Sequence, residues 1–130
     1  MKRYVSDTHT LFWHLTGSDK LGPNAAQAFV EGEEGNAVIY VPTIVLAELY
    51  YLNRKLRLPL DFAQTFQRIA ETSHFCLIPL LPEDIAAFDS LPAELEMHDR
   101  MIARSACRLD AVLLTRDATI IASAAARTAW

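Results

Sequence analysis

The chain has 130 residues, of which 52% are hydrophobic and 22% are charged. This length and composition fit one globular domain over residues 1–130 and exclude a mainly disordered protein. The net charge of −4 excludes capture of nucleic acid by a broadly basic surface, because phosphate binding depends on clustered Lys and Arg, so any such contact must be local.

From the N-terminus, the predicted elements are a strand over 4–7, helices over 8–15 and 25–34, a strand over 37–41, helices over 43–56 and 61–72, a strand over 75–80, helices over 82–89 and 98–109, a strand over 111–115 and a helix over 118–127. The strands are short and apolar, and the helices carry apolar residues at helical spacing. Asn24 is the predicted N-cap of the second helix, and Pro59 closes the third. This alternation predicts an α/β fold, a three-layer α/β/α sandwich with a central, mainly parallel sheet.

The sequence also predicts a soluble protein of the cytoplasm. No run of about 18 apolar residues is present, which is roughly the length that a membrane-spanning helix needs. The first residues lack the apolar stretch of a signal peptide. Cys76 and Cys107 have neither metal-ligand nor redox spacing, and their apolar neighbours predict buried free thiols in a reducing compartment.

Three aspartates occupy positions that suggest a role in a binding site. Asp7 ends the first predicted strand, Asp117 follows the strand over 111–115 by two residues, and both would project from the carboxyl edge of the sheet. Each could instead cap the helix that follows it. Asp99 lies in the first turn of its helix on the same arc as Ile102, so it points toward the core side, although a first-turn acid also complements the helix dipole.

Glu48 is the most informative acidic residue, because it lies on the apolar arc of its helix between Ile44 and Leu52. An inward carboxylate must be paired, protonated, hydrated or bound to a cation. The main structural alternative to a functional role is a salt bridge to an arginine such as Arg54 or Arg100.

Together these four residues form what we call the acidic quartet: Asp7, Glu48, Asp99 and Asp117. If they converge, like-charge repulsion raises some of their pKa values unless a cation neutralises them. Such hard oxygen ligands suit Mg²⁺ or Mn²⁺. A cation held there could polarise a phosphodiester and activate a water for hydrolysis, so we predict that the quartet is both catalytic and metal-binding.

Four motifs carry a resemblance to a known family: Tyr-Val-Ser-Asp-Thr-His at 4–9, Val-Leu-Ala-Glu-Leu at 45–49, His-Asp-Arg-Met-Ile-Ala at 98–103 and Leu-Thr-Arg-Asp at 114–117. With them the chain resembles the PIN-domain ribonucleases, especially the VapC-type toxins of bacterial toxin–antitoxin pairs. The resemblance implies a PIN fold and a Mg²⁺- or Mn²⁺-dependent endoribonuclease. It also implies a small antitoxin partner that covers the acidic groove, and a homodimer.

The same resemblance implies roles for individual residues. Asp7 and Asp99 would hold the cation most directly, Asp117 would help, and Glu48 would act directly or through water. Thr115 lies where the family often has a hydroxyl residue near the site, and it is a candidate substrate contact.

A basic stripe is the remaining candidate for RNA binding. Arg100, Arg104 and Arg108 recur every four residues on one helix and could guide RNA phosphates toward the acids, or they could form an ordinary solvated face. His9 and His98 adjoin quartet members and could touch substrate.

Two other functions compete with the nuclease. A phosphatase of the haloacid-dehalogenase pattern would need a second aspartate two residues after Asp7, where this chain has His9. A non-catalytic domain whose acids dock a basic partner is the alternative from a different class, and the intact quartet favours the enzyme.

Overall fold

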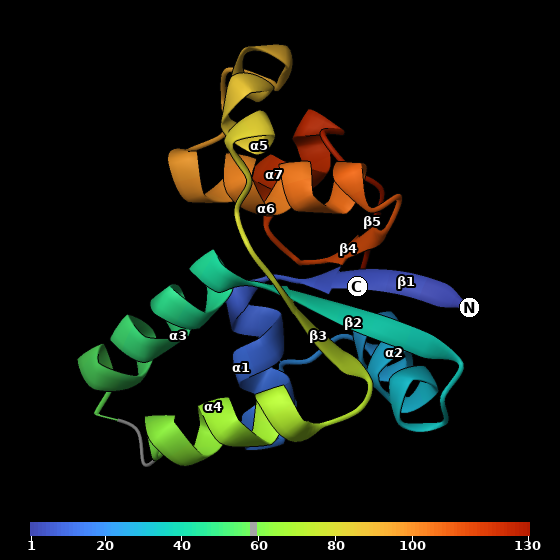
Figure 1. The fold of residues 1–130 in the computed structure, drawn as a ribbon, viewed down its shortest axis with the longest axis vertical. Helices are drawn as coiled ribbons and strands as arrows, with labels where there is room; N and C mark the ends of the chain where they lie inside the picture. Colours follow the sequence, from blue (N-terminus) through green and yellow to red (C-terminus); the bar gives the residue numbers. More distant parts are fainter. Residues whose placement is uncertain (58–59) are drawn as a thin grey trace.

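A computed structural model describes residues 1–57 and 60–130 (Figure 1). In these residues, five strands form one sheet in the order β3-β2-β1-β4-β5, and every neighbouring pair is parallel. The strands are β1 (Lys2–Ser6), β2 (Ala37–Pro42), β3 (Phe75–Ile78), β4 (Val112–Leu114) and β5 (Thr128–Ala129). The predicted parallel sheet is therefore confirmed.

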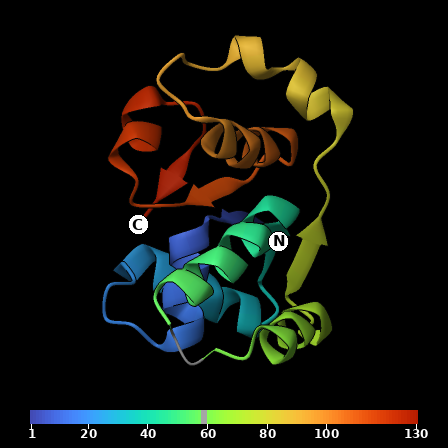
Figure 2. The same ribbon diagram turned by 90° about the vertical axis from the view of Figure 1, so that its left-hand side faces the viewer.

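Helices cover both faces of this sheet. The described α-helices are α1 (Thr8–Thr16), α2 (Pro23–Glu33), α3 (Thr43–Lys55), α4 (Phe62–Glu71), α5 (Pro82–Ala86), α6 (Met97–Arg108) and α7 (Ala118–Ser123), and a 3₁₀ helix, η1, spans Phe88–Ser90. Figures 1 and 2 show α1 to α4 on one side of the sheet and α5 to α7 on the other. This arrangement confirms the predicted three-layer α/β/α architecture.

The strand order reverses at β1, which locates the place where a ligand would bind. The chain builds the sheet outward from β1 through β2 to β3, then crosses to the other side of β1 to add β4 and β5. In open parallel sheets, ligands bind outside the carboxyl ends of the strands at such a reversal. Asp7 follows β1 and Asp117 follows β4, so both lie at this position.

The carboxyl ends of the two central strands, β1 and β4, are buried on both faces of the sheet. Val5 and Ser6 in β1, and Leu113 and Leu114 in β4, are all fully buried. Helices cover both faces at these positions, whereas Lys2 and Arg3 at the amino end of β1 are exposed. Burial of each such Val or Leu side chain contributes about 1.5–3 kcal/mol, so the two strands that precede Asp7 and Asp117 are firmly held.

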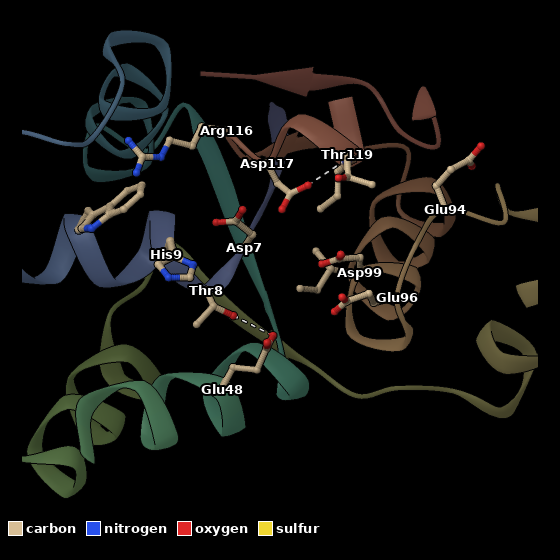
Figure 3. Close-up of a pocket in the computed structure, with 13 residues that line it drawn as sticks. Asp7, Thr8, His9, Glu48, Glu94, Glu96, Asp99, Arg116, Asp117 and Thr119 are labelled. Carbon is tan, nitrogen blue, oxygen red and sulfur yellow. Dashed lines mark hydrogen bonds between the residues drawn. The ribbon is translucent and has the colours of Figure 1, made fainter. Parts of the chain in front are cut away.

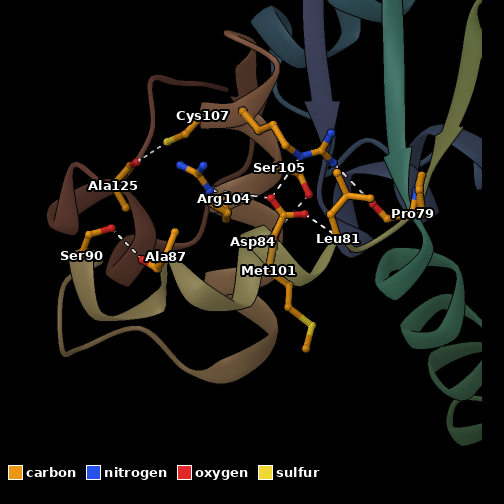
Figure 4. A network of polar contacts seen from close by, with 11 residues as sticks. Pro79, Leu81, Asp84, Ala87, Ser90, Met101, Arg104, Ser105, Cys107 and Ala125 are labelled. Atoms are coloured by element: carbon orange, nitrogen blue, oxygen red, sulfur yellow. Dashed lines mark hydrogen bonds and ion pairs between the residues drawn. The ribbon is translucent and has the colours of Figure 1, made fainter.

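A buried carboxylate ties α5 to α6, the helix that carries Asp99 (Figure 4). The side chain of Asp84 is 0% exposed, and its Oδ1 accepts a hydrogen bond from Nε of Arg108 at 3.0 Å and lies 3.7 Å from Nε of Arg104. Its Oδ2 accepts from the backbone N–H of Leu81 at 2.9 Å. Asp84 therefore fixes the position of α6 against the preceding segment.

Arg100 fixes the same segment from the other end of α6. Its guanidinium donates to four backbone carbonyls, those of Phe88 at 2.7 Å, Leu91 at 3.4 Å, Pro92 at 2.9 Å and Leu95 at 2.9 Å. These contacts order the chain that leads into the first turn of α6.

Three local predictions were wrong. The N-cap of α2 is Gly22, not Asn24, with Pro23 at the first helical position, which its fixed φ favours. A Cβ on Gly22 would lie 2.6 Å from the Trp130 ring, so this position needs glycine. The thiols of Cys76 and Cys107 are free, but the first is only partly buried and the second is exposed.

The last segment also differs from its prediction. The helix predicted over 118–127 ends at Ser123, Ala124 adopts a left-handed φ of 53°, and the chain then pairs with β4 as β5. Tertiary pairing here overrides the helix propensity of the alanine-rich segment. The predicted role of Pro59 lies outside the described residues. Among the described helices, none is long and apolar enough to cross a membrane.

We predict that Asp84→Asn lowers the free energy of unfolding by about 3 kcal/mol, because it leaves two partly buried arginines without their anion. Urea unfolding followed by circular dichroism measures the change. The control is Asp89→Asn, an exposed acid in the neighbouring η1, whose effect should stay within about 0.5 kcal/mol. Equal unfolding midpoints for the two variants would show that Asp84 does not anchor α6.

Candidate active site

A pocket of about 440 Å³ opens beyond the carboxyl ends of β1 and β4 (Figure 3). It is lined from α1, α3, the segment entering α6 and the turn from β4 into α7. Its acidic lining residues are Asp7, Glu48, Glu94, Glu96, Asp99 and Asp117. All four members of the predicted quartet therefore line one pocket, as the sequence reasoning required.

Asp7 and Asp117 act as helix caps and line the pocket at the same time. Oδ1 of Asp7 accepts from the N–H of Thr10 at 2.9 Å, and Oδ1 of Asp117 accepts from the N–H of Ile120 at 2.9 Å. Within the described residues, Oδ2 of each aspartate has no hydrogen-bond or ion-pair partner. The helix-capping alternative therefore holds for both aspartates, and it leaves the second oxygen of each available to a ligand.

Glu48 has different partners from those predicted. The hydroxyl of Thr8 donates to its Oε1 at 2.9 Å, and Nδ1 of His98 lies 3.4 Å from its Oε2. The salt bridge to arginine is not formed, because Arg54 donates to a tyrosine hydroxyl and Arg100 donates to backbone carbonyls. The side chain is 30% exposed, so this carboxylate is partly hydrated and stays open to the pocket.

The quartet members interact electrostatically at Asp99. The pKa of the Asp99 carboxyl is raised to about 6, mainly by burial and then by the negative charges of Asp117, Glu96, Glu48 and Asp7, in that order of importance. The three other quartet members therefore all disfavour a charged Asp99. A pocket with this property favours the uptake of positive charge, either a proton or a cation.

The donors fit a hard divalent cation in their chemistry. Carboxylate oxygens suit Mg²⁺, which usually keeps several waters and takes only one or two protein carboxylates. Among residues 1–57 and 60–130, no three His, Cys, Asp or Glu side chains are grouped so that they could hold a metal ion. The pocket therefore offers carboxylates for a partly hydrated cation without a preformed cage.

Two acids of the pocket were missed by the sequence reasoning. Glu94 and Glu96 lie in the segment that Arg100 orders, and Glu96 is the N-cap residue of α6. Glu96 also raises the pKa of Asp99. The two glutamates just before Asp99 were a sequence signal for a larger acidic site. Because their segment has no regular periodicity, the sequence does not show whether their side chains point toward the pocket.

The three predicted substrate contacts have structural partners. Thr115 is fully buried, and its Oγ1 accepts from the N–H of Asp117 at 3.0 Å, so it positions this acid. Arg100 is engaged by backbone carbonyls, and Arg104 lies against Asp84 (Figure 4). We therefore do not assign these residues to substrate, and the predicted basic stripe is not a free surface.

An open parallel sheet with a carboxylate-lined pocket at its point of reversal defines an α/β protein with an acidic site. The family model of the PIN domain matches residues 4–127, and the chain therefore belongs to the PIN-domain family. No curated protein matches the chain significantly.

Solved structures share the fold. VapBC2 from Rickettsia felis, bound to a DNA fragment from its promoter, is 18% identical with a TM-score of 0.69, and the match covers 98% of this chain and 97% of that one. FitAcB from Neisseria gonorrhoeae is 16% identical with a TM-score of 0.66, covering 96% and 95%. The PIN domain endonuclease Utp24 is 15% identical with a TM-score of 0.50, covering 92% and 74%.

We predict that Asp99→Asn stabilises the metal-free protein at pH 7 by roughly 1 kcal/mol, a value reduced for the solvent that screens this partly exposed group. Because the pKa of Asp99 is raised from 3.8 to about 6, its charge costs stability above pH 6. The cost fades as the pH falls from 6 toward 4, so the difference between wild type and variant should shrink over this range.

Urea unfolding in EDTA at several pH values measures this difference. Asp19→Asn, at an exposed acid outside the pocket, is the control and should leave stability unchanged at each pH. A wild type as stable as Asp99→Asn at pH 7 would contradict the raised pKa of Asp99, which burial and the neighbouring acids produce.

Proposed function

We propose that this protein is a Mg²⁺- or Mn²⁺-dependent endoribonuclease that hydrolyses RNA phosphodiesters, and that it is the toxin of a toxin–antitoxin pair. The observation that carries the proposal is a pocket lined by four carboxylates from separate parts of the chain, three of which help to raise the pKa of the fourth, Asp99. Membership of the PIN-domain family and the fold shared with the endonuclease Utp24 support the nuclease activity.

Asp7 and Asp99 are the proposed direct ligands of the cation, with Asp117 and Glu48 as further ligands, direct or through water. A divalent cation bound there would supply a polarised phosphodiester and a water of lowered pKa as the nucleophile. The other residues orient these acids. The Thr8 hydroxyl holds one oxygen of Glu48, and the buried Thr115 hydroxyl fixes the backbone at Asp117.

The toxin role rests on the resemblance to VapC-type toxins and on the fold shared with VapBC2 of Rickettsia felis and VapBC-1 of nontypeable Haemophilus influenzae. By this likeness, the proposed partners are a small cognate antitoxin that covers the acidic pocket and a second copy of the chain in a homodimer. The proposed setting is the cytoplasm, where the RNA substrate is available.

We predict that the purified protein cuts total cellular RNA with Mg²⁺ or Mn²⁺ and not with EDTA, leaving 5′-phosphate and 3′-hydroxyl ends, because an activated water attacks the phosphodiester. Asp7→Asn and Asp99→Asn should each lower the rate at least about 100-fold, since each removes a charge from the proposed cation site. Gel analysis of labelled RNA measures rate and end chemistry, with Asp19→Asn as the variant that keeps full activity.

Two results would contradict the proposal. Cutting that persists in EDTA, or ends that carry 2′,3′-cyclic phosphate, would exclude hydrolysis by metal-activated water. A folded wild type, free of antitoxin, that cuts no RNA would favour the non-catalytic docking domain.

A further inference from the structure

One cation lines the acidic pocket. Arg116 lies in the turn between β4 and α7, and it is the only Lys or Arg among the residues that line this pocket. Its side chain is exposed, and within residues 1–57 and 60–130 it makes no hydrogen bond or ion pair. Six carboxylates line the same pocket, yet none of them pairs with this guanidinium.

Arg116 lies instead on an aromatic ring. Its guanidinium carbon is 4.3 Å from the centre of the Trp13 ring. Trp13 is only 7% exposed and is itself fixed, because it packs edge-on against Trp130 at 5.7 Å and against His9 at 5.5 Å. A cation–π contact does not use the N–H donors of a guanidinium in hydrogen bonds, so the contact with Trp13 can hold Arg116 while these donors stay free.

The position of Arg116 suits an anionic ligand of the pocket. Arg116 lines the pocket together with Asp7 and Asp117, and Figure 3 shows its side chain extending away from these two carboxylates. An RNA strand brings one negative charge per phosphate, and a pocket with six carboxylates repels it. A cation at the quartet could neutralise the phosphate that reacts, but the neighbouring phosphates of the strand need a separate positive group. A planar guanidinium with free donors matches the geometry of phosphate oxygens.

We propose that Arg116 binds a backbone phosphate of the RNA strand beside the acidic quartet, and that Trp13 positions its guanidinium for this contact. The inference rests on the proposed ribonuclease function and adds the residue that overcomes the pocket's repulsion of its substrate. Trp13 is a positioning residue, because it acts through Arg116.

The test measures binding of a fluorescently labelled single-stranded RNA by anisotropy in EDTA, where the proposed enzyme does not cut. Arg116→Gln should weaken binding roughly tenfold, since a charge-assisted phosphate contact is lost. The slope of log affinity against log salt concentration should fall by about 0.7, the value for one phosphate contact on a single strand. Arg116→Lys keeps the charge and should retain the slope while losing part of the affinity.

The matched control is Arg3→Gln. Arg3 is an exposed residue of β1 near its amino end, whereas the pocket lies beyond the carboxyl end, and the substitution changes the net charge equally. It should leave affinity and slope as in wild type. If Arg116→Gln binds RNA with the same affinity and salt slope as Arg3→Gln, the inference is wrong.

Trp13→Phe and Trp13→Leu test the positioning role. The Phe variant keeps an aromatic ring under the guanidinium and should retain most of the RNA affinity. The Leu variant should lose most of it. Thermal unfolding of both variants checks that they are folded. Equal affinity of two folded Trp13 variants would overturn the positioning role, and the Arg116 variants decide the phosphate contact even where Trp13→Leu fails to fold.

Failure of this inference can be told apart from failure of the proposed function. Wild type that cuts RNA, with Arg116→Gln and Arg3→Gln equal in binding and in KM, overturns the role of Arg116 alone. Wild type that binds RNA through Arg116 but does not cut it overturns the nuclease alone. Wild type that neither binds nor cuts RNA overturns both.

Discussion

The parallel pairing of β1 with β4 is the contact on which the acidic pocket depends. Ser6 lies opposite Leu114 in the register, and the N–H of Asp7 continues the ladder by donating to the Leu114 carbonyl at 3.3 Å. The hydroxyl of Thr10 donates to the same carbonyl at 2.9 Å. Asp7 therefore leaves β1 beside the place where the chain turns toward Asp117. A slip of one residue in this pairing would turn these side chains to the opposite face of the sheet. The position of Asp7 relative to Asp117 therefore depends on this register.

The acidic side chains of the pocket repel Asp99, and hydrogen bonds of Arg100 and Arg108 hold its helix, α6, in place against this repulsion. The first turn of this helix carries Asp99 toward the other acids, while Arg108, near its end, is bound to the buried Asp84. Arg100 joins the helix to the segment that carries Glu96 through four carbonyls. The arginines that the sequence suggested for RNA thus hold α6 in place against the repulsion, and the fold supports an arrangement of charges that is unfavourable without a cation.

Much of the fold and the convergence of the quartet on one pocket could be predicted from the sequence, because the spacing of apolar residues indicates each element. Asp7 and Asp117 follow strand ends, and Glu48 and Asp99 lie on the apolar arcs of their helices. The partners of the arginines could not be predicted, since helical spacing shows which residues share a face but not which segment packs on it. Asp84, which binds Arg104 and Arg108, comes from a different helix. The two-residue β5 has no pattern of its own, because it depends on pairing with β4.

The helix-capping role of Asp7 and Asp117, beside their proposed role in the site, affects how sequences of relatives are interpreted. Each caps a helix through one oxygen, so each would be kept by selection for folding even in a descendant that had lost all catalysis. Glu48 and Asp99 cap nothing in the described residues, and a charged Asp99 is disfavoured by its surroundings. Under the proposed nuclease function, retention of Glu48 and Asp99 in related sequences is therefore the better marker of an active enzyme, because Asp7 and Asp117 would also be retained for helix capping.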